Sequence, residues 1–280
     1  MFHPIISGKG KQMEECEDMR TKKLTFSFDD GVWQDARLLE ILNRYNLKAT
    51  FNLNSARFGE SGTLCAHGKT ISYRRFRAED IPQIYRGHEI GAHTMTHRNL
   101  TQLSDEQVIS EVESDRLALS ALCGYEVLGM AYPCGGTNYT AHVVNLIQTY
   151  TGIRYARTIT ASGSFAFPKD LFRLNPTVRM TDFARLHALF DQFLSLPASE
   201  PAVFSIWGHS FDLDFFEAWD LFEEFCRKAA DCGAVTSCTN SEAFFATTKI
   251  FSYKRRKSCA TKSEGKFFEK SLVQKPSEYG

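Results

Sequence analysis

Two short segments of the sequence place reactive side chains directly after apolar, strand-like runs. The segment LTFSFDDG ends in two adjacent carboxylates, Asp29 and Asp30. The segment GAHTMTH carries His93 and His97, whose spacing of four lets two imidazoles face one metal ion from a tight loop. An Asp-Gly pair is also ordinary turn chemistry, and paired histidines are often structural. Each segment alone therefore leaves both interpretations open.

Two further segments carry weaker signals. In AYPCGGTN, Gly135 and Gly136 follow Pro133. They would let the backbone approach a ligand, with an exposed N–H for an oxyanion, although the same residues are common in turns. In FSIWGHS, His209 stands beside Trp207 at the end of an apolar run, where a packed or capping histidine is the ordinary alternative.

The four segments together predict hydrolytic chemistry. Asp30, His93 and His97 supply one carboxylate and two neutral nitrogens, a common catalytic ligand set that leaves metal positions open for water. Asp29 lies next to this set without having to bind the metal, and His209 provides a further titratable group. One metal, one base and one acid are what metal-assisted hydrolysis of an amide or ester requires.

Composition indicates a globular protein with one large α/β domain. The 280 residues are 43% apolar and 24% charged, close to globular averages. A formal net charge of zero gives no basic footprint for nucleic acid. We expect a flexible leader at 1–22, a catalytic domain at 23–250 and a disordered tail at 251–280, where eight basic side chains face three glutamates.

Cysteine usage and the first residues predict a cytoplasmic protein. The eight cysteines form no CxxC pair, and Cys123, Cys226 and Cys238 fall in apolar stretches that suit reduced thiols. The first 20 residues do not read as a secretory signal peptide, and no window approaches 18 uninterrupted apolar residues. We therefore expect no membrane span, and export by a route without such a peptide stays open.

Strand-like and helical patterns alternate along the chain and predict parallel βα units. A capping box at Ser104 and Gln107 opens the longest helix. Residues 55–77 are irregular and predict a long loop or small excursion. The expected strands are 23–28, 47–54, 87–94, 127–133, 153–159, 201–210 and 234–239, and the expected helices are 35–46, 78–86, 104–124, 139–152, 182–196, 215–233 and 240–250. Seven such repeats suit a barrel whose catalytic groups lie at the strand ends.

The segments TFSFDDG, HTMTH, AYPCGG and WGHS, in this order, resemble the polysaccharide deacetylases of the NodB-homology type, carbohydrate esterase family 4. The likeness runs from about residue 22 to 250. It implies a distorted (β/α)7 barrel, similar to a TIM barrel, and a metal-dependent hydrolase that removes acetyl groups from N-acetylated or O-acetylated carbohydrate. The first two segments are the more specific part of this resemblance.

The resemblance also implies residue roles. Asp29 matches the general base, His209 the general acid, and Asp30, His93 and His97 the metal ligands. The implied metal is zinc, with cobalt, nickel or manganese as alternatives. The backbone N–H of Cys134 would share the oxyanion with the metal, and the residues expected to line this oxyanion and substrate region are Cys134, Tyr132, Trp207 and Arg173.

One position departs from the family pattern. Many members have an arginine two residues before the Pro133 position, where it orients the catalytic aspartate, and this chain has Ala131. Arg173 is our candidate for the missing contact. The acidic partner of His209 stays unassigned, since Asp212 and Asp214 are near only in sequence.

Two alternative functions stay open at this point. Similar proteins open small cyclic amides by hydrolysing another C–N bond, and an intracellular location would suit a small soluble substrate. The change at Ala131 also makes a catalytically degenerate carbohydrate-binding protein conceivable. The expected partner is an acetylated saccharide or a small amide, and the oligomeric state is unknown. Loops such as 55–77 are expected to set the substrate.

Overall fold

The computed structural model describes residues 22–245. The predicted leader and basic tail lie outside the described residues, apart from Lys22, which begins the first strand. Within residues 22–245, no helix is both long enough and apolar enough to cross a membrane.

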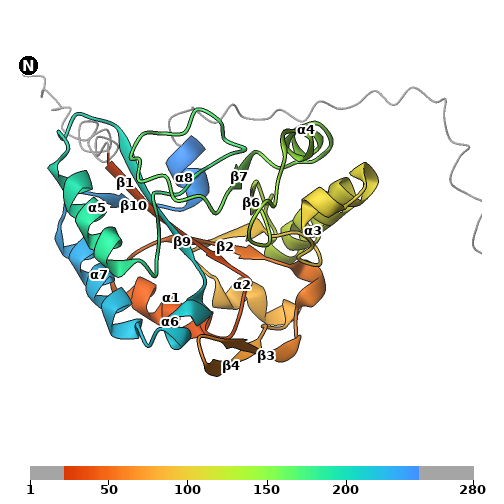
Figure 1. Ribbon diagram of the computed structural model, residues 1–280, viewed down its shortest axis with the longest axis horizontal. Coiled ribbons are helices and arrows are strands. Elements are labelled where there is room, and N and C mark those ends of the chain that lie inside the picture. The colour runs from red at the N-terminus through yellow and green to blue at the C-terminus, as the bar shows by residue number, and fades with distance from the viewer. Residues whose placement is uncertain (1–21, 246–280) are drawn as a thin grey trace, which may run out of the picture. The chain divides into compact units, whose positions relative to one another are not determined.

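A parallel, curled sheet of eight strands forms the centre of the domain (Figure 1). Seven strands follow the order β7-β6-β5-β2-β1-β9-β8, and β10 pairs with β1 beside this path. The strands are β1 (Lys22–Asp29), β2 (Ala49–Leu53), β5 (Glu89–Ala92), β6 (Gly129–Ala131), β7 (Tyr155–Arg157), β8 (Val178–Arg179), β9 (Ala202–Gly208) and β10 (Thr236–Ser237). This is the predicted class of fold, a distorted barrel of parallel βα units.

Strand β1 separates an apolar helix-facing side from a polar interior. Phe26 and Phe28 are fully buried and pack edge-on against Phe222 of the helix α7 (Trp219–Asp231). Because side chains alternate along a strand, Ser27 and Asp29 point to the opposite side, where Ser27 Oγ accepts hydrogen bonds from other strands. The polar side of β1 therefore carries Asp29 towards the inside of the curl.

Helices lie around the sheet and connect its strands (Figure 1). The predicted capping box at Ser104 is confirmed at the start of α3. In addition to α7, the α-helices are α1 (Asp35–Arg44), α2 (Ile81–Ile84), α3 (Asp105–Cys123), α4 (Ala141–Tyr150), α5 (Phe183–Ser195), α6 (Ser210–Phe215) and α8 (Asn240–Phe245), and short 3-10 turns are η2 (Ser55–Arg57), η3 (Ala78–Asp80) and η4 (Leu100–Gln102).

Three segments differ from the expected elements. Residues 55–77 contain a two-stranded antiparallel hairpin, β3 (Ser61–Ala66) and β4 (Lys69–Arg74), rather than a plain loop. The helix expected at 215–233 begins later, as α7 at Trp219, after Glu217 with its left-handed φ of 50°, and the short helix α6 before it was not predicted. Strand β8 was not predicted, because two residues are too short for a periodic pattern.

One contact measures the curl of the sheet. Arg157 ends β7 and Asp29 ends β1, with three strands between them in the sheet order, yet their side chains form an ion pair. In a flat sheet, four strand spacings would separate them by roughly 19 Å. An arginine side chain cannot span that distance, so the sheet must curl until β7 faces β1 across its interior.

Candidate active site

The predicted site residues meet at the carboxyl ends of the parallel strands. Asp29 ends β1 and Asp30 follows it, His93 follows β5, and His209 follows β9. Together they line an open pocket of about 580 Å³, a size common for ligand sites. The lining residues are Asp29, Asp30, His93, His97, Tyr132, Cys134, Gly135, Ile159, Ala161, Arg179, Trp207 and His209.

Three of these side chains could hold a metal ion. One ligand atom from each of Asp30, His93 and His97 lies within 4.8 Å of the others. Asp30 Oδ1 is 3.5 Å from His97 Nε2 and 4.0 Å from His93 Nε2. Ligands at zinc bond lengths of 2.0–2.2 Å in a tetrahedron are about 3.4 Å apart, so the cluster fits such an ion after a small contraction. Two imidazoles and one carboxylate are also suitable donors for zinc.

The two histidines are poised as neutral ligands. His93 Nδ1 lies 2.8 Å from the carbonyl oxygen of Ala131, so it donates there and leaves Nε2 free for a metal. Burial lowers the pKa of His93, and burial followed by the charge of His93 lowers the pKa of His97 to about 4. Neutral imidazoles are the form that binds metal.

Asp30 is buried and has an unusual backbone conformation. Its φ is 85° and that of Gly31 is 65°, both left-handed. A Cβ on Gly31 would lie 2.6 Å from Leu53 Cδ2, so glycine is required there twice over, by conformation and by space. This explains why the two carboxylates are followed by a glycine.

Arg75, just after the β3–β4 hairpin, connects the two ligand-bearing segments. Its Nη1 donates to the Asp30 carbonyl oxygen, and its Nη2 lies 3.2 Å from Asp30 Oδ1. Nη1 also donates to Asn54 Oδ1, and Asn54 Nδ2 donates to the carbonyl oxygens of His93 and Thr94. A single buried guanidinium therefore holds both the aspartate and the histidine loop. Nothing in the sequence pattern of 55–77 marked this residue.

Asp115 on α3 also holds the backbone segment that carries His93. Its two carboxylate oxygens accept hydrogen bonds from the backbone N–H groups of Ser55 and His93, at 2.7 Å and 3.0 Å. Burial raises the pKa of Asp115 to about 7. The helix α3 thereby fixes the backbone from which His93 projects.

Asp29 is a buried carboxylate with dedicated donors. Arg157 Nη2 donates to both of its oxygens, and Asn52 Nδ2 donates to Oδ1 at 2.8 Å. Burial by itself would raise the pKa of Asp29, but the charges of Arg157, His93 and His209 together outweigh it and hold the pKa below its ordinary value. Asp29 is therefore ionised near neutrality and able to accept a proton.

The contact to Asp29 corrects our expectation for Arg173. Arg173 pairs with Asp170 at the surface and does not line the pocket. Arg157 at the end of β7 makes the contact instead and fills the place that Ala131 on β6 leaves open. A charged residue within the strand-like run IRYARTI was the available signal.

The proposed acid has a carboxylate partner. His209 Nδ1 lies 3.3 Å from Asp212 Oδ2, and His209 Nε2 lies 4.0 Å from Asp30 Oδ2. Burial lowers the pKa of His209, but the hydrogen bond to Asp212 and the charges of Asp30 and Asp29 outweigh it and raise the pKa above its ordinary value. Of the two nearby aspartates, Asp214 instead accepts from Gln34 and Trp219.

The expected oxyanion and substrate residues differ in their placement. Cys134, Tyr132 and Trp207 line the pocket, whereas Arg173 does not. Cys134 has a left-handed φ of 69°, and within residues 22–245 its backbone N–H donates to no protein acceptor. Tyr132 is anchored by its hydroxyl, which donates to the Phe172 carbonyl oxygen at 2.9 Å. The free N–H of Cys134 matches what an oxyanion donor requires.

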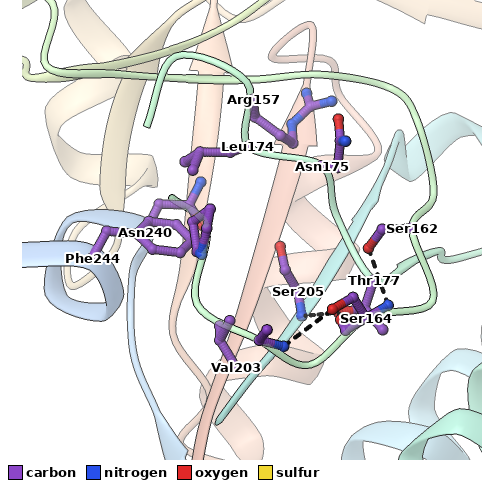
Figure 2. Close-up of a pocket in the computed structure, with 12 residues that line it drawn as sticks. Arg157, Ser162, Ser164, Leu174, Asn175, Thr177, Val203, Ser205, Asn240 and Phe244 are labelled. Atoms are coloured by element: carbon purple, nitrogen blue, oxygen red, sulfur yellow. Dashed lines mark hydrogen bonds between the residues drawn. The ribbon is translucent and has the colours of Figure 1, made fainter. Parts of the chain in front are cut away.

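A second cavity lies under the segment that closes the gap between β7 and β8 (Figure 2). Its volume is about 30 Å³, enough for roughly one water molecule and far too small for a sugar. Ser205 and Thr177 are joined by a hydrogen bond within it, and Thr177 also donates to the Ser164 carbonyl oxygen. Of these two, only the pocket with the carboxylates and histidines has room for a sugar.

Comparison with known proteins identifies the family of this chain. The family model described as polysaccharide deacetylase matches residues 17–156. A chitin deacetylase of a Pestalotiopsis species is 30% identical over 147 residues, 52% of this chain and 43% of that protein. A peptidoglycan-N-acetylglucosamine deacetylase of Listeria monocytogenes is 25% identical over 119 residues, 42% of this chain and 22% of that protein. The chain thus spans less than half the length of these relatives.

A solved structure shows the same fold. The carbohydrate esterase family 4 domain of a multidomain xylanase, from the hindgut metagenome of Trinervitermes trinervoides, superimposes with a TM-score of 0.53 at 17% identity, covering 80% of this chain and 89% of that domain. The family match includes the carboxylate and histidine segments and ends one residue before Arg157. This chain belongs to the polysaccharide deacetylase family, with a NodB-homology domain of carbohydrate esterase family 4.

Proposed function

We propose that this chain removes acetyl groups from an N-acetylated carbohydrate in a metal-dependent hydrolysis. The observation that carries the proposal is the grouping of a possible metal cluster, an ionised buried carboxylate and a carboxylate-linked histidine in one open pocket. Membership in the polysaccharide deacetylase family supports the same reaction class.

Asp30, His93 and His97 would hold a divalent ion, for which zinc is our first choice. Such an ion supplies a polarised acyl carbonyl and a more acidic water. Asp29 accepts the proton of the attacking water, and Arg157 keeps the carboxylate in place for this step. The Cys134 N–H donates to the oxygen that becomes negatively charged.

His209 completes the reaction by giving its Nε2 proton to the departing nitrogen. An amine is a poor leaving group unless it is protonated, so this step matters most for N-acetyl substrates. Asp212 holds Nδ1 and raises the pKa of the imidazole, which keeps it protonated nearer to neutral pH. The presence of Arg157 beside Asp29 argues against the degenerate binding protein that Ala131 suggested.

A chelation experiment tests the proposal. The full chain is stripped of metal and assayed for acetate release from acetylated chito-oligosaccharides before and after zinc is added back. We expect activity to disappear on stripping and to return with about one equivalent of zinc. His97→Ala should not recover, whereas His142→Ala should, because His142 is an exposed residue paired with Asp105.

Two results would contradict the proposal. Acetate release that survives complete metal removal would exclude the metal role. No acetate release by the zinc-loaded chain, together with opening of a small cyclic amide, would favour the other C–N hydrolase. A cytoplasmic location also stays part of the proposal, based on the cysteine pattern, and cell fractionation tests it.

A further inference from the structure

Each carboxylate at the catalytic pocket has its own arginine. Asp29 pairs with Arg157 and Asp30 with Arg75, both buried. The carboxylate of Asp212, which supports His209, pairs with Arg179 at 2.9 Å. The formal charges of these three pairs therefore sum to zero. With a divalent ion bound by the cluster and His209 protonated, the pocket would carry a net positive charge, since no unpaired carboxylate among the described lining residues offsets it.

Arg179 differs from the other two arginines in its exposure and its hydrogen bonds. The side chains of Arg157 and Arg75 are 2% and 1% exposed, whereas that of Arg179 is 44% exposed and lines the pocket. Within residues 22–245, Arg179 donates one side-chain hydrogen bond, to Asp212. A guanidinium has five N–H donors, so most of this fork is available to a ligand.

Arg179 is held in place by contacts that leave most of its N–H donors free. It ends β8, and its guanidinium carbon lies 5.5 Å from the ring centre of Trp207, which lines the same pocket. Asp212 Oδ2 fixes it on one side. A planar, partly fixed guanidinium is well suited to bind a carboxylate through two parallel hydrogen bonds.

The position of Arg179 also limits where that carboxylate can be. Asp212 Oδ2 lies 2.9 Å from Arg179 Nη2 and 3.3 Å from His209 Nδ1, so a single carboxylate separates the guanidinium from the proposed acid. His209 would contact the nitrogen that loses its acetyl group. A substrate carboxylate bound by Arg179 would therefore lie on the same side of the pocket as the acetylated nitrogen.

We propose that Arg179 binds a carboxylate of the substrate, so that the site prefers an N-acetylated saccharide with an acidic substituent close to the acetamido group. This inference rests on the proposed deacetylase function and narrows its substrate class. The simpler alternative is that Arg179 only positions Asp212. The two differ in one measurable quantity, the preference for an acidic over a neutral substrate.

N-Acetylmuramic acid and N-acetylglucosamine are the matched probes, because they differ by one carboxylate-bearing ether next to the acetamido group. Binding of each to the full chain is measured by calorimetry, with and without zinc, and acetate release is measured in parallel. We expect the acidic probe to be favoured by about 10- to 100-fold, as a charge-assisted hydrogen-bond pair allows.

Arg179→Met should abolish this preference, and Arg179→Lys should keep part of it, since the charge remains but the fork is lost. The control is Arg227→Met, an exposed arginine on α7 away from the pocket, which should leave the preference unchanged. Melting temperatures of all variants show whether each is folded.

The outcomes separate the two proposals. Equal binding and turnover of both probes by the wild type would overturn the carboxylate site and leave the deacetylase function intact. If Arg179→Met lost binding and turnover equally for the acidic and the neutral probe, the carboxylate site would also be overturned. A residue that only positions Asp212 would affect the two probes alike. If neither probe releases acetate, the deacetylase proposal fails for such substrates, while the calorimetric preference still decides the role of Arg179.

Discussion

The base side and the acid side of the pocket are built in opposite ways. Asp29 and its partner Arg157 are both 2% exposed and form a buried ion pair across the interior of the sheet. His209 is 21% exposed, and Arg179, which holds its partner Asp212, is 44% exposed. The proposed proton acceptor is thus fixed inside the fold, whereas the proposed proton donor lies at the open side.

This difference separates a part of the site that must be rigid, around Asp29, from a part whose surroundings can vary, around His209. A buried pair keeps Asp29 ionised and fixed, but it makes the fold depend on that pair. The open acid side leaves room for groups of the substrate and for tuning of the His209 pKa by its neighbours. The contrast also explains how the arginine that contacts Asp29 can come from β7 instead of β6. What matters is that a guanidinium reaches Asp29, whichever strand carries it.

The largest effect is expected on the base side. Arg157→Met leaves the buried Asp29 carboxylate without its main partner, so we expect the free energy of unfolding to fall by about 3–5 kcal/mol. Acetate release should fall as well, because burial then raises the pKa of Asp29. Denaturant titration and steady-state kinetics measure the two changes.

Arg173→Met is the matched control for that variant. Arg173 is the arginine that the sequence suggested, and its pair with Asp170 is about 40% exposed. We expect a change of stability within about 0.5 kcal/mol. If Arg173→Met and Arg157→Met behaved alike, the assignment of the base contact to Arg157 would be wrong.

A smaller effect is expected at the metal ligands. Arg75→Met removes the group that holds both Asp30 and the loop of His93, through Asn54. We expect zinc affinity to fall by about 10- to 100-fold, the range seen when groups that orient metal ligands are removed. Calorimetric titration with zinc measures it.

Arg57→Met is the control for the metal measurement, because Arg57 precedes the same hairpin but pairs with Glu60 near the surface. The zinc affinity of the Arg57→Met variant should equal that of the wild type. Unchanged affinity in Arg75→Met would show that the ligand segments hold themselves without the arginine.

The smallest effect is expected on the acid side. Asp212→Asn removes the hydrogen bond that contributes most to raising the pKa of His209 against burial, so that pKa should fall. In the proposed mechanism, His209 acts in its protonated form. The alkaline limb of the kcat/KM profile should therefore move to lower pH, with the acidic limb little changed. An unmoved alkaline limb would assign that limb to another group.

The grouping of the candidate site residues could be predicted because each has a local signal. Asp29, Asp30, His93 and His209 follow apolar runs, and the carboxyl ends of parallel strands meet at one edge of the sheet. The start of α3 was equally local, since a capping box lies within four residues. Such signals need no knowledge of distant contacts.

The groups that hold the chemistry in place could not be predicted in the same way. Arg157 lies 128 residues from Asp29, and its contact depends on how far the sheet curls. Arg75 depends on a hairpin that replaces the expected loop. Residues 216–218 include no proline or glycine, so nothing local in the sequence marked the later start of α7.

The role of Asp29 as the base is the centre of this account, and Asp29→Asn tests it most directly. The variant keeps the shape of the side chain but cannot accept the proton. With the fold intact and one equivalent of zinc still bound, we predict that kcat/KM for an N-acetylated chito-oligosaccharide falls by about 10²- to 10⁴-fold. Turnover equal to that of the wild type in the zinc-loaded variant would contradict the account.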